Sequence, residues 1–515
     1  MIYPKEYYLQ LFQVTEEALD RLVGEGLARG GDYSDLYFEN TGYGNLVLRD
    51  GEVSSGGAHV DFGVGVRVLS GEKTGYAYSE TTAFADMLAS ARAAAAIANG
   101  RGLPPGLSFT PGEAALERKQ ALEVMRAVHD RADSFAPLAG NGFRSVKKSF
   151  LGAPNPAADR YPQQQSWREA QVAEFLPFLL RIDAGIRARD SRVVKVIAML
   201  SWNVTDVLMY NSLQELKYDT RPMGSLSVSV VFQQGGQTEN KTVSRSFRQG
   251  WEMLSDSLCR TLVDEAVRGV DERFDARRPK GGQMRVVMGA GASGILLHEA
   301  MGHAFEADFN RKGQSIFSER MGQRVCAEGI SILDDATLKG NRGALNFDDE
   351  GVPGQKTYMV ENGVLSSYLH DRVSARFYGV TPTGNGRRES FRYPPVPRMR
   401  TTYMEGGDAS PEDIIASVRQ GVYVDEFSNG QVKIGEGDFT FYVKSGFLIE
   451  NGRLTAPVKD INVIGNGPAA LADIVAVGND LRIDDGSWVC GKEQSVPVSC
   501  GIPTVLVNNL TVGGE

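Results

Sequence analysis

The pattern of hydrophobic and polar positions near the start of the chain switches from helical to alternating and back again. Apolar residues in 13–29 recur every three or four positions, which predicts an amphipathic helix. Over 33–80 they alternate with polar residues in short runs broken by Gly, Asp-Gly and Ser-Gly turns, which is typical of an antiparallel meander. The Ala-rich segment 82–98 returns to helical spacing, and we expect this helix to pack across the meander.

The middle of the chain mixes turn-rich segments with further periodic ones. Segment 99–113 is rich in Gly and Pro and predicts a linker or long loop, and 150–167 predicts a second irregular segment. The periodicity also predicts helices at 114–135, near 168–187 and at 254–268, and strand-like runs over 192–202, 206–212, 225–233 and 237–247.

From residue 283 onward the pattern is one of strands and turns with a single notable helix. Asn-Gly pairs within 359–369 and 448–458 predict two β-hairpins. Strands joined mostly by hairpins favour an α+β fold over a parallel α/β sheet. We expect three parts, namely an N-terminal subdomain of antiparallel sheet with packed helices, a middle α+β region that completes the N-terminal half, and a C-terminal domain of mostly antiparallel twisted sheets, over 1–110, 111–278 and 279–515.

Composition and charge narrow the classes of function. The chain has 515 residues, 42% of them hydrophobic and 23% charged, which is ordinary globular composition. The net charge of −9 and the lack of a contiguous basic segment argue against direct nucleic-acid binding. We expect no signal peptide and no membrane span, because no apolar run is long enough. Four cysteines without a C-x-x-C pair favour a reducing compartment, the cytoplasm.

A glycine-rich turn precedes the notable helix. Gly289, Gly291 and Gly294 form a G-x-G-x-x-G pattern between a predicted strand and a predicted helix, the formal context of a dinucleotide-binding turn. The surrounding sequence shows no repeated βαβ pattern, so we expect the glycines to serve the conformation of the backbone rather than a nucleotide. A tight turn needs glycines if the helix is to begin close to the sheet.

The helix itself carries two of the five histidines of the chain. His298 and His303 flank Glu299 in the pattern H-E-x-x-x-H, one residue longer than the zinc-peptidase pattern H-E-x-x-H. On a regular helix two residues five positions apart point about 140° away from each other, so they could not share one ion. Either a π-bulge realigns the pair or the helix ends near Gly302. Both alternatives predict an irregular backbone between Ala300 and His303.

A catalytic zinc site requires three protein ligands and an open position, so a third ligand is needed. The residues alone leave its identity open among Glu306, Asp308, His370 and the cysteines, of which Cys490 lies in a turn-rich segment and offers a soft thiolate. Glu299 would be the general base, and the alternative is an ordinary surface glutamate on a helix.

Two acidic clusters lie elsewhere, at Asp334-Asp335 and at 348–351. Clustered carboxylates can bind a hard cation. The turn signals around both clusters favour solvated loops instead.

Several blocks resemble the TldD branch of the TldD/PmbA family, known as modulators of DNA gyrase and as metallopeptidases. They include GILLHEAMGHAFEADFNRKGQSIFS, DDEGVPGQKTYMVENGVL, TPTGNGRRES, PVPRMRTTYM and CGKEQSVPV. The resemblance is dense over 280–515, patchy over 20–100 and thin over 101–270.

The resemblance implies a zinc peptidase that cleaves extended or unfolded peptides inside the chamber of a dimer, either a homodimer or a heterodimer with a metal-free paralogue. It implies His298, His303 and Cys490 as the zinc ligands and Glu299 as the catalytic base. The family's C-G-K-x-G-Q block is one glycine short here, and Cys500 follows closely, so the sequence offers a second thiol. The alternative function is a non-catalytic peptide-binding or assembly subunit of the same family.

Overall fold

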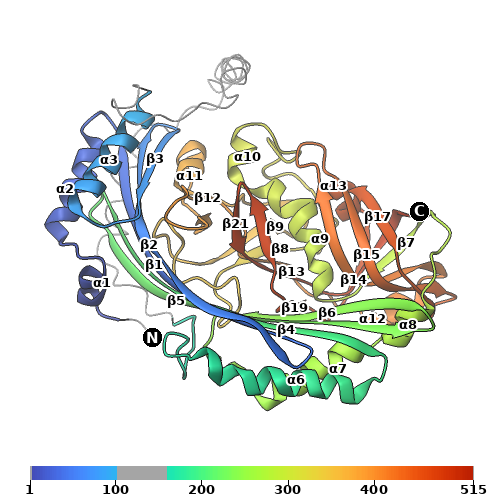
Figure 1. The fold of residues 1–515 in the computed structure, drawn as a ribbon. Coiled ribbons are helices and arrows are strands. Elements are labelled where there is room, and N and C mark those ends of the chain that lie inside the picture. The colour runs from blue at the N-terminus through green and yellow to red at the C-terminus, as the bar shows by residue number, and fades with distance from the viewer. Residues whose placement is uncertain (1–2, 101–158, 514–515) are drawn as a thin grey trace.

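The computed structural model describes residues 3–100 and 159–513, and the predicted helix at 114–135 lies outside them, as do nearly all of the predicted linker and the start of the irregular segment 150–167. The N-terminal half of the described chain is built on one six-stranded antiparallel sheet in the order β3-β2-β1-β4-β5-β6 (Figure 1). The strands are β1 (Tyr33–Arg49), β2 (Glu52–Ser70), β3 (Lys73–Ser79), β4 (Val193–Asn211), β5 (Leu216–Gln234) and β6 (Gln237–Phe247). The meander predicted over 33–80 is confirmed, and the predicted runs 192–202 and 206–212 are one strand, β4.

Two groups of helices cover the outer face of this sheet. Helices α2 (Glu16–Leu27) and α3 (Phe84–Ala98) pack at one end, and α6 (Leu176–Arg189) and α7 (Asp256–Val267) at the other (Figure 1). The predicted helices at 13–29, 82–98 and 254–268 are thus confirmed, and the one near 168–187 begins later than expected. A further short helix, α1 (Lys5–Leu11), packs beside α2.

Strand alternation gives the sheet two different faces. In β1, Leu36 and Phe38 point into the core formed with α2 and α3, whereas Tyr37 and Glu39 point to the opposite face. That inner face is buried too, because Tyr37 packs with Phe347 and Phe391 of the C-terminal half. The inner face of the sheet therefore packs against the C-terminal half of the molecule.

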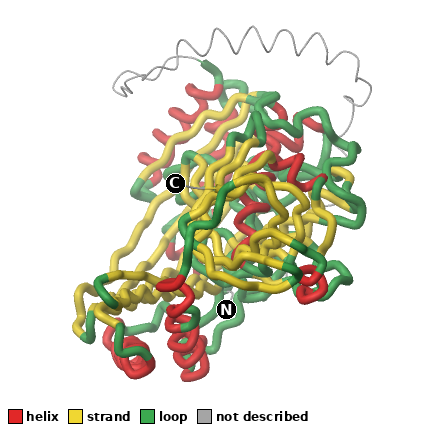
Figure 2. Tube along the Cα trace, turned by 90° about the vertical axis from the view of Figure 1, so that its right-hand side faces the viewer, coloured by secondary structure: helices red, strands yellow, loops and turns green. Residues whose placement is uncertain are grey.

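The C-terminal half combines a seven-stranded sheet closed on itself with a second, six-stranded sheet. In the first, β14-β7-β23-β17-β15 form a ring that the β14–β15 pairing closes, and in the second the order is β10-β9-β8-β13-β22-β19. The β7–β14 and β13–β22 pairs are parallel and the remaining pairs of these sheets are antiparallel. In the perpendicular view strands fill the interior of the molecule (Figure 2). The α+β fold is thereby confirmed.

The remaining α-helices and β-strands of the described chain begin at residue 270 or later. The closed sheet contains β7 (Gly282–Met288), β14 (Gln420–Val432), β15 (Asp438–Glu450), β16 (Arg453–Val458), β17 (Ile461–Asn466), β18 (Ile474–Val477) and β23 (Val505–Gly513). The second sheet contains β8 (Ile332–Asp335), β9 (Lys356–Glu361), β10 (Val364–Leu365), β13 (Thr401–Met404), β19 (Arg482–Ile483) and β22 (Ser499–Ile502), and two small ribbons pair β11 (Gly386–Arg387) with β12 (Val396–Pro397) and β20 (Val489–Lys492) with β21 (Gln494–Pro497). The helices are α8 (Val270–Asp275), α9 (Ile295–Leu297), α10 (Ala307–Arg311), α11 (Arg372–Tyr378), α12 (Pro411–Ala416) and α13 (Gly467–Ala472). Within the described ranges no helix is long and apolar enough to cross a membrane.

Both predicted hairpins are present. Asn362 and Gly363 join β9 to β10 with positive φ angles of 48° and 79°, and Asn451 and Gly452 join β15 to β16 with 54° and 76°. Two successive positive φ angles are the requirement of a type I′ turn, which Asn-Gly meets at low cost.

The interpretation of the acidic clusters as solvated loops is wrong, because both are buried. Asp334 is fully buried and accepts a 2.7 Å hydrogen bond from Arg400 Nε. Asp349 and Glu350 form ion pairs of 2.5 and 2.6 Å with Arg221 and Arg67, which lie on the inner face of the N-terminal sheet. The turn residues around the clusters suggested loops, and the sequence could not reveal the ion pairs because the arginine partners are 128 and 283 residues away. The carboxylates at 348–351 therefore join the two halves.

Glu39 on the same inner face predicts a pH-dependent stability. Burial, with smaller contributions from Asp349 and Asp61, raises the pKa of Glu39 to about 7 from an ordinary 4.5. A raised carboxyl pKa stabilises the fold fully below the ordinary value, and the stabilisation is lost as pH rises through 7. In Glu39→Gln the amide can keep both hydrogen bonds, accepting from the Phe391 N–H and donating to Thr41 Oγ1. We expect Glu39→Gln to gain up to about 3 kcal/mol over wild type between pH 5 and pH 8.

Thermal unfolding at the two pH values checks this, with Glu52→Gln, an exposed position on β2, as the matched control. The melting temperature of Glu39→Gln should exceed that of wild type at pH 8 by clearly more than at pH 5. An equal difference at both pH values would show that Glu39 does not titrate in this range.

Candidate metal centre

The glycine-rich turn sets the helix directly against the second sheet. A Cβ atom at Gly294 would lie 2.7 Å from the backbone nitrogen of Gly501 in β22, closer than any side chain allows. This confirms that glycine is needed for the helix to begin near the sheet. Strand β7 lies between parallel β14 and antiparallel β23 and belongs to no βαβ unit, so the dinucleotide-binding interpretation has no structural basis.

The extra residue of H-E-x-x-x-H is accommodated by a π-helical turn. After the single α-helical turn α9, residues His298–Gly302 form a π-helix, and His303–Phe305 form a 3₁₀ turn. The first of the two predicted alternatives is thus confirmed. The two imidazole rings lie on the same side, with centroids 5.1 Å apart and planes at 83°. A π turn adds the one residue that a regular helix could not accommodate.

Cys490 joins the two histidines from the β20–β21 hairpin. Its Sγ lies 3.4 Å from His303 Nε2, although the residues are 187 positions apart in sequence. One donor atom from each of His298, His303 and Cys490 lies within 4.8 Å of the others, and all three side chains are buried. Both ring nitrogens of His298 lack a hydrogen-bond partner within the described structure. Buried polar atoms without a partner call for one, and two imidazoles with a thiolate are a donor set that suits zinc.

The electrostatics distinguish Cys490 from Cys500. Burial raises the pKa of the Cys490 thiol, but His298 and His303 outweigh it and lower that pKa to about 4. Cys490 is therefore a thiolate at neutral pH, the form that binds metal. Burial raises the pKa of Cys500 well above its ordinary value, and Asp484 and Glu299 raise it further. Cys500 lies in β22 outside the cluster, so the described structure offers one thiolate beside the histidines.

The residues alone left Glu306 and Asp308 open as third ligands, but neither carboxylate belongs to the three-residue cluster. The Glu306 carboxylate accepts a 2.9 Å hydrogen bond from His303 Nδ1, which directs Nε2 toward Cys490. Burial raises the pKa of Glu306, but Lys492 and His303 lower it to about 2, so it stays ionised. The Lys492 ammonium contacts both carboxylates, at 3.0 Å for Glu306 and 2.8 Å for Asp308. A carboxylate on the far ring nitrogen of a ligating histidine fixes its tautomer and orientation.

His370, the remaining histidine weighed as a ligand, lies outside the cluster, and burial lowers its pKa to about 4.

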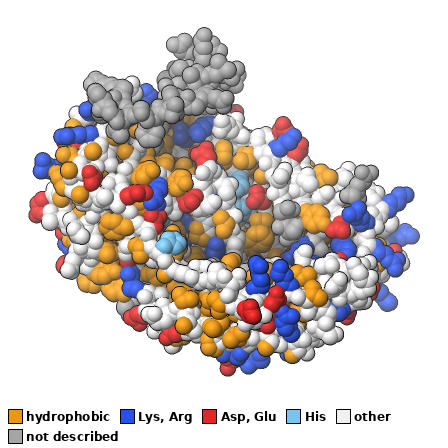
Figure 3. All heavy atoms as spheres, in the orientation of Figure 1, with side chains coloured by type: hydrophobic (Ala, Val, Ile, Leu, Met, Phe, Trp, Pro, Cys, Tyr) orange, Lys and Arg blue, Asp and Glu red, His pale blue; other side chains and the backbone are white. Residues whose placement is uncertain are grey.

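Glu299 is half-buried beside His298, and its carboxylate forms no hydrogen bond or ion pair with the described residues. The molecule is visibly hollowed between its two halves on the face shown in Figure 3.

Two residues that hold the site were missed by motif reasoning. Arg398 is fully buried, and its guanidinium donates to the carbonyl oxygens of Cys490 at 2.6 Å and Gln494 at 2.8 Å, which anchors the hairpin. Lys492 follows Cys490 by two positions and holds Glu306. Both residues occur in the sequence blocks PVPRMRTTYM and CGKEQSVPV, which are the only sequence signal that could have pointed to them.

Family models match three consecutive parts of the chain. Residues 34–98 match PmbA/TldA metallopeptidase domain 1, 165–271 match the central domain and 281–514 match the C-terminal domain. Domain 1 and the central domain share the six-stranded sheet, because β1 pairs with β4.

Named relatives agree with these matches. The chain is 38% identical to "Metalloprotease TldD homolog" of Haemophilus influenzae over 94% of this chain and 93% of that protein. It is 32% identical to "Zinc metalloprotease TldD homolog" of Saccharolobus solfataricus over 56% of this chain and 65% of that protein.

Solved structures share the fold. A putative modulator of DNA gyrase from Bacteroides thetaiotaomicron superimposes with a TM-score of 0.72 at 17% identity, covering 97% of this chain and 99% of that one. TldE from Thermococcus kodakarensis gives 0.69 at 18% identity, covering 96% of this chain and 100% of that one.

Metal content tests the three-residue cluster. We expect about one zinc per chain in protein prepared with zinc. Elemental analysis should show that zinc is lost in His298→Ala and in Cys490→Ser but retained in Cys500→Ser, the matched thiol control. Loss of zinc only in Cys500→Ser would mean that the other thiol is the ligand.

Glu306→Gln tests the orienting role of the carboxylate. We expect a 10- to 100-fold lower zinc affinity, measured by competition with a chromophoric chelator, because His303 loses an ionised hydrogen-bond acceptor. Glu361→Gln, exposed on β9, is the control and should match wild type. Unchanged affinity in Glu306→Gln would exclude a contribution of this carboxylate to metal binding.

Proposed function

The chain belongs to the PmbA/TldD family of metallopeptidases, and we propose that it is a zinc-dependent peptidase that cleaves extended or unfolded peptides. The observation that carries this proposal is the convergence of His298, His303 and Cys490, whose donor atoms lie within 4.8 Å of one another. The name of the Saccharolobus relative includes zinc, which supports the choice of metal.

In this proposal the three side chains hold the zinc, and Glu306 keeps the His303 ring in place. Zinc bound there would supply Lewis acidity, which polarises a peptide carbonyl and makes water nucleophilic at neutral pH. Glu299 accepts the proton of the attacking water on its carboxylate and passes it to the nitrogen of the leaving amine. Its freedom from other hydrogen bonds among the described residues leaves it available for both transfers.

We further propose that the enzyme works as a dimer around a shared chamber, either with a second copy of itself or with a metal-free paralogue. The likeness to TldE, a protein of the same fold, supports a paralogous partner. The four cysteines are all free, which supports a reducing compartment such as the cytoplasm.

Glu299→Gln tests the catalytic step. We expect hydrolysis of an unstructured, quenched fluorescent peptide to fall by about 10²- to 10⁴-fold, because the general base is lost. Zinc content and melting temperature should stay at wild-type values, which separates the loss of the base from the loss of the site. Glu328→Gln, at an exposed position outside the motif, controls for the change of charge.

If the zinc-loaded wild-type protein binds the peptide but does not cleave it, the chain is a binding or assembly subunit. If Glu299→Gln cleaves at the wild-type rate, the base has been assigned wrongly.

A further inference from the structure

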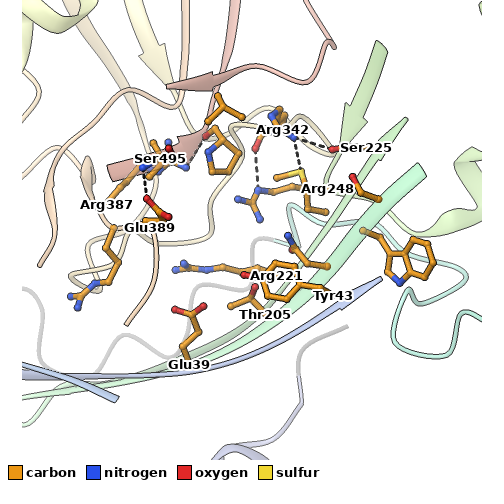
Figure 4. A pocket seen from close by; sticks show the side chains of 18 of the residues that line it. Glu39, Tyr43, Thr205, Arg221, Ser225, Arg248, Arg342, Arg387, Glu389 and Ser495 are labelled. Carbon is orange, nitrogen blue, oxygen red and sulfur yellow. Dashed lines mark hydrogen bonds between the residues drawn. The ribbon is translucent and has the colours of Figure 1, made fainter. Parts of the chain in front are cut away.

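A cavity of about 550 Å³ lies between the inner face of the N-terminal sheet and the C-terminal half (Figure 4). Strands β1, β4 and β5 contribute one wall, which includes Glu39, Tyr43 and Thr205. The β20–β21 hairpin contributes the opposite wall through Val489 and residues 495–497. Because Cys490 follows Val489 directly, the hairpin that lines the cavity also carries the thiolate of the proposed zinc site.

Three buried arginines line this cavity without a carboxylate partner. Arg248, Arg342 and Arg387 are only 6, 6 and 3% exposed, and none of them forms an ion pair with the described part of the chain. A buried charge without a counter-charge costs free energy.

The hydrogen bonds of these arginines go to neutral groups. Arg342 Nε donates to the Trp488 carbonyl at 2.8 Å, Arg248 Nε to the Arg342 carbonyl at 3.1 Å, and Arg387 Nη2 to the Pro497 carbonyl at 2.8 Å. These bonds fix the guanidinium groups in place, but their acceptors carry no charge.

Two of the guanidinium groups retain free donors. Arg248 and Arg342 lie together at one end of the cavity, where a dashed line marks the bond between them (Figure 4). Their Nη2 groups donate no hydrogen bond within the described residues. A guanidinium presents its N–H groups in a planar fork that matches the two oxygens of a carboxylate.

The acidic groups that face the cavity are already engaged. Asp349 is paired with Arg221 at 2.5 Å, and Glu39 accepts hydrogen bonds from Thr41 and from the Phe391 N–H, both at 2.8 Å. Glu389 is exposed and accepts a 2.5 Å hydrogen bond from the Ser495 N–H. Burial lowers the pKa of Arg342 and of Arg387 to about 9, so both remain cationic at neutral pH. The cavity therefore keeps an excess of positive charge.

We propose that Arg248 and Arg342, with Arg387 nearby, bind a carboxylate of the peptide substrate in this cavity. The carboxylate is either the C-terminal group of the peptide or an Asp or Glu side chain. The substrate class rests on the proposed peptidase function, whereas the need for an anion rests on the arginines themselves. This subsite would hold an acidic group of the peptide beside the hairpin that carries Cys490.

The test measures binding without turnover. Zinc-loaded Glu299→Gln protein is titrated into fluorescently labelled, unstructured peptides, and anisotropy gives the Kd. One pair of peptides differs only in a C-terminal acid or amide, and a second, amidated pair differs only in one internal Glu or Gln. We expect the carboxylate form to bind about 10- to 100-fold tighter in at least one pair, and that pair identifies the source. Equal affinities in both pairs, or no binding of any peptide, would overturn the proposal.

Variants then locate the preference. Arg248→Gln and Arg342→Gln should each reduce this preference, the ratio of the two Kd values within one variant, at least about 10-fold. Arg260→Gln, exposed on α7, changes the net charge equally and should keep the preference. Arg342→Lys retains the positive charge but lacks the planar guanidinium group. It replaces Arg342→Gln in the test if thermal melting shows that the Arg342→Gln protein is unfolded. A preference that survives in the folded variants would place the carboxylate elsewhere.

Failure of the subsite and failure of the proposed function give different results. If zinc-loaded wild-type protein cleaves the peptides with and without the carboxylate with the same kcat/KM, the enzyme is a peptidase and the subsite proposal is wrong. If the carboxylate preference is present but no peptide is cleaved, the subsite stands and the peptidase proposal is wrong.

Discussion

The contact between His303 and Cys490 is the constraint on which the rest of the site depends. Two side-chain atoms 3.4 Å apart come from residues 187 positions apart, so the helix and the β20–β21 hairpin must be fixed relative to each other. Gly294 brings the start of the helix to the sheet, and Arg398 anchors the hairpin through the Cys490 carbonyl. The π turn then places His298 on the side of His303. Gly294, Arg398 and the π turn come from different parts of the chain, and each helps to fix the helix and the hairpin relative to each other.

Buried ion pairs between residues that are remote in sequence hold the two halves of the molecule together. Burying an ion pair is unfavourable unless its partners are well aligned, and here Arg67 and Arg221 of the sheet meet Glu350 and Asp349 of the C-terminal half at 2.6 and 2.5 Å. These pairs fix the inner face of the sheet opposite the C-terminal domain. The cavity with its unpaired arginines is a consequence of that placement, because one wall comes from each half.

Local pattern was enough to predict the parts of the structure that short-range physics decides. Period-two alternation located strands of the N-terminal sheet but not their full length, Asn-Gly located two hairpins, and the arithmetic of H-E-x-x-x-H gave the π turn as one of two alternatives. The third member of the cluster could not be derived in this way, because spacing does not reveal which distant residue folds back beside His303, and only the family resemblance indicated Cys490. The acidic segment 348–351 was misinterpreted for the same reason, since its arginine partners are remote in sequence. Arg398 and Lys492 act through buried contacts that leave no periodic signal.

The most direct test of the account is X-ray absorption at the zinc edge on protein prepared with zinc. The account predicts a first coordination shell with one sulfur and two imidazole nitrogens from the protein, with the sulfur absent in Cys490→Ser and present in Cys500→Ser. A shell without sulfur in the wild-type protein, or one whose sulfur survives in Cys490→Ser, would contradict the proposed His298–His303–Cys490 site.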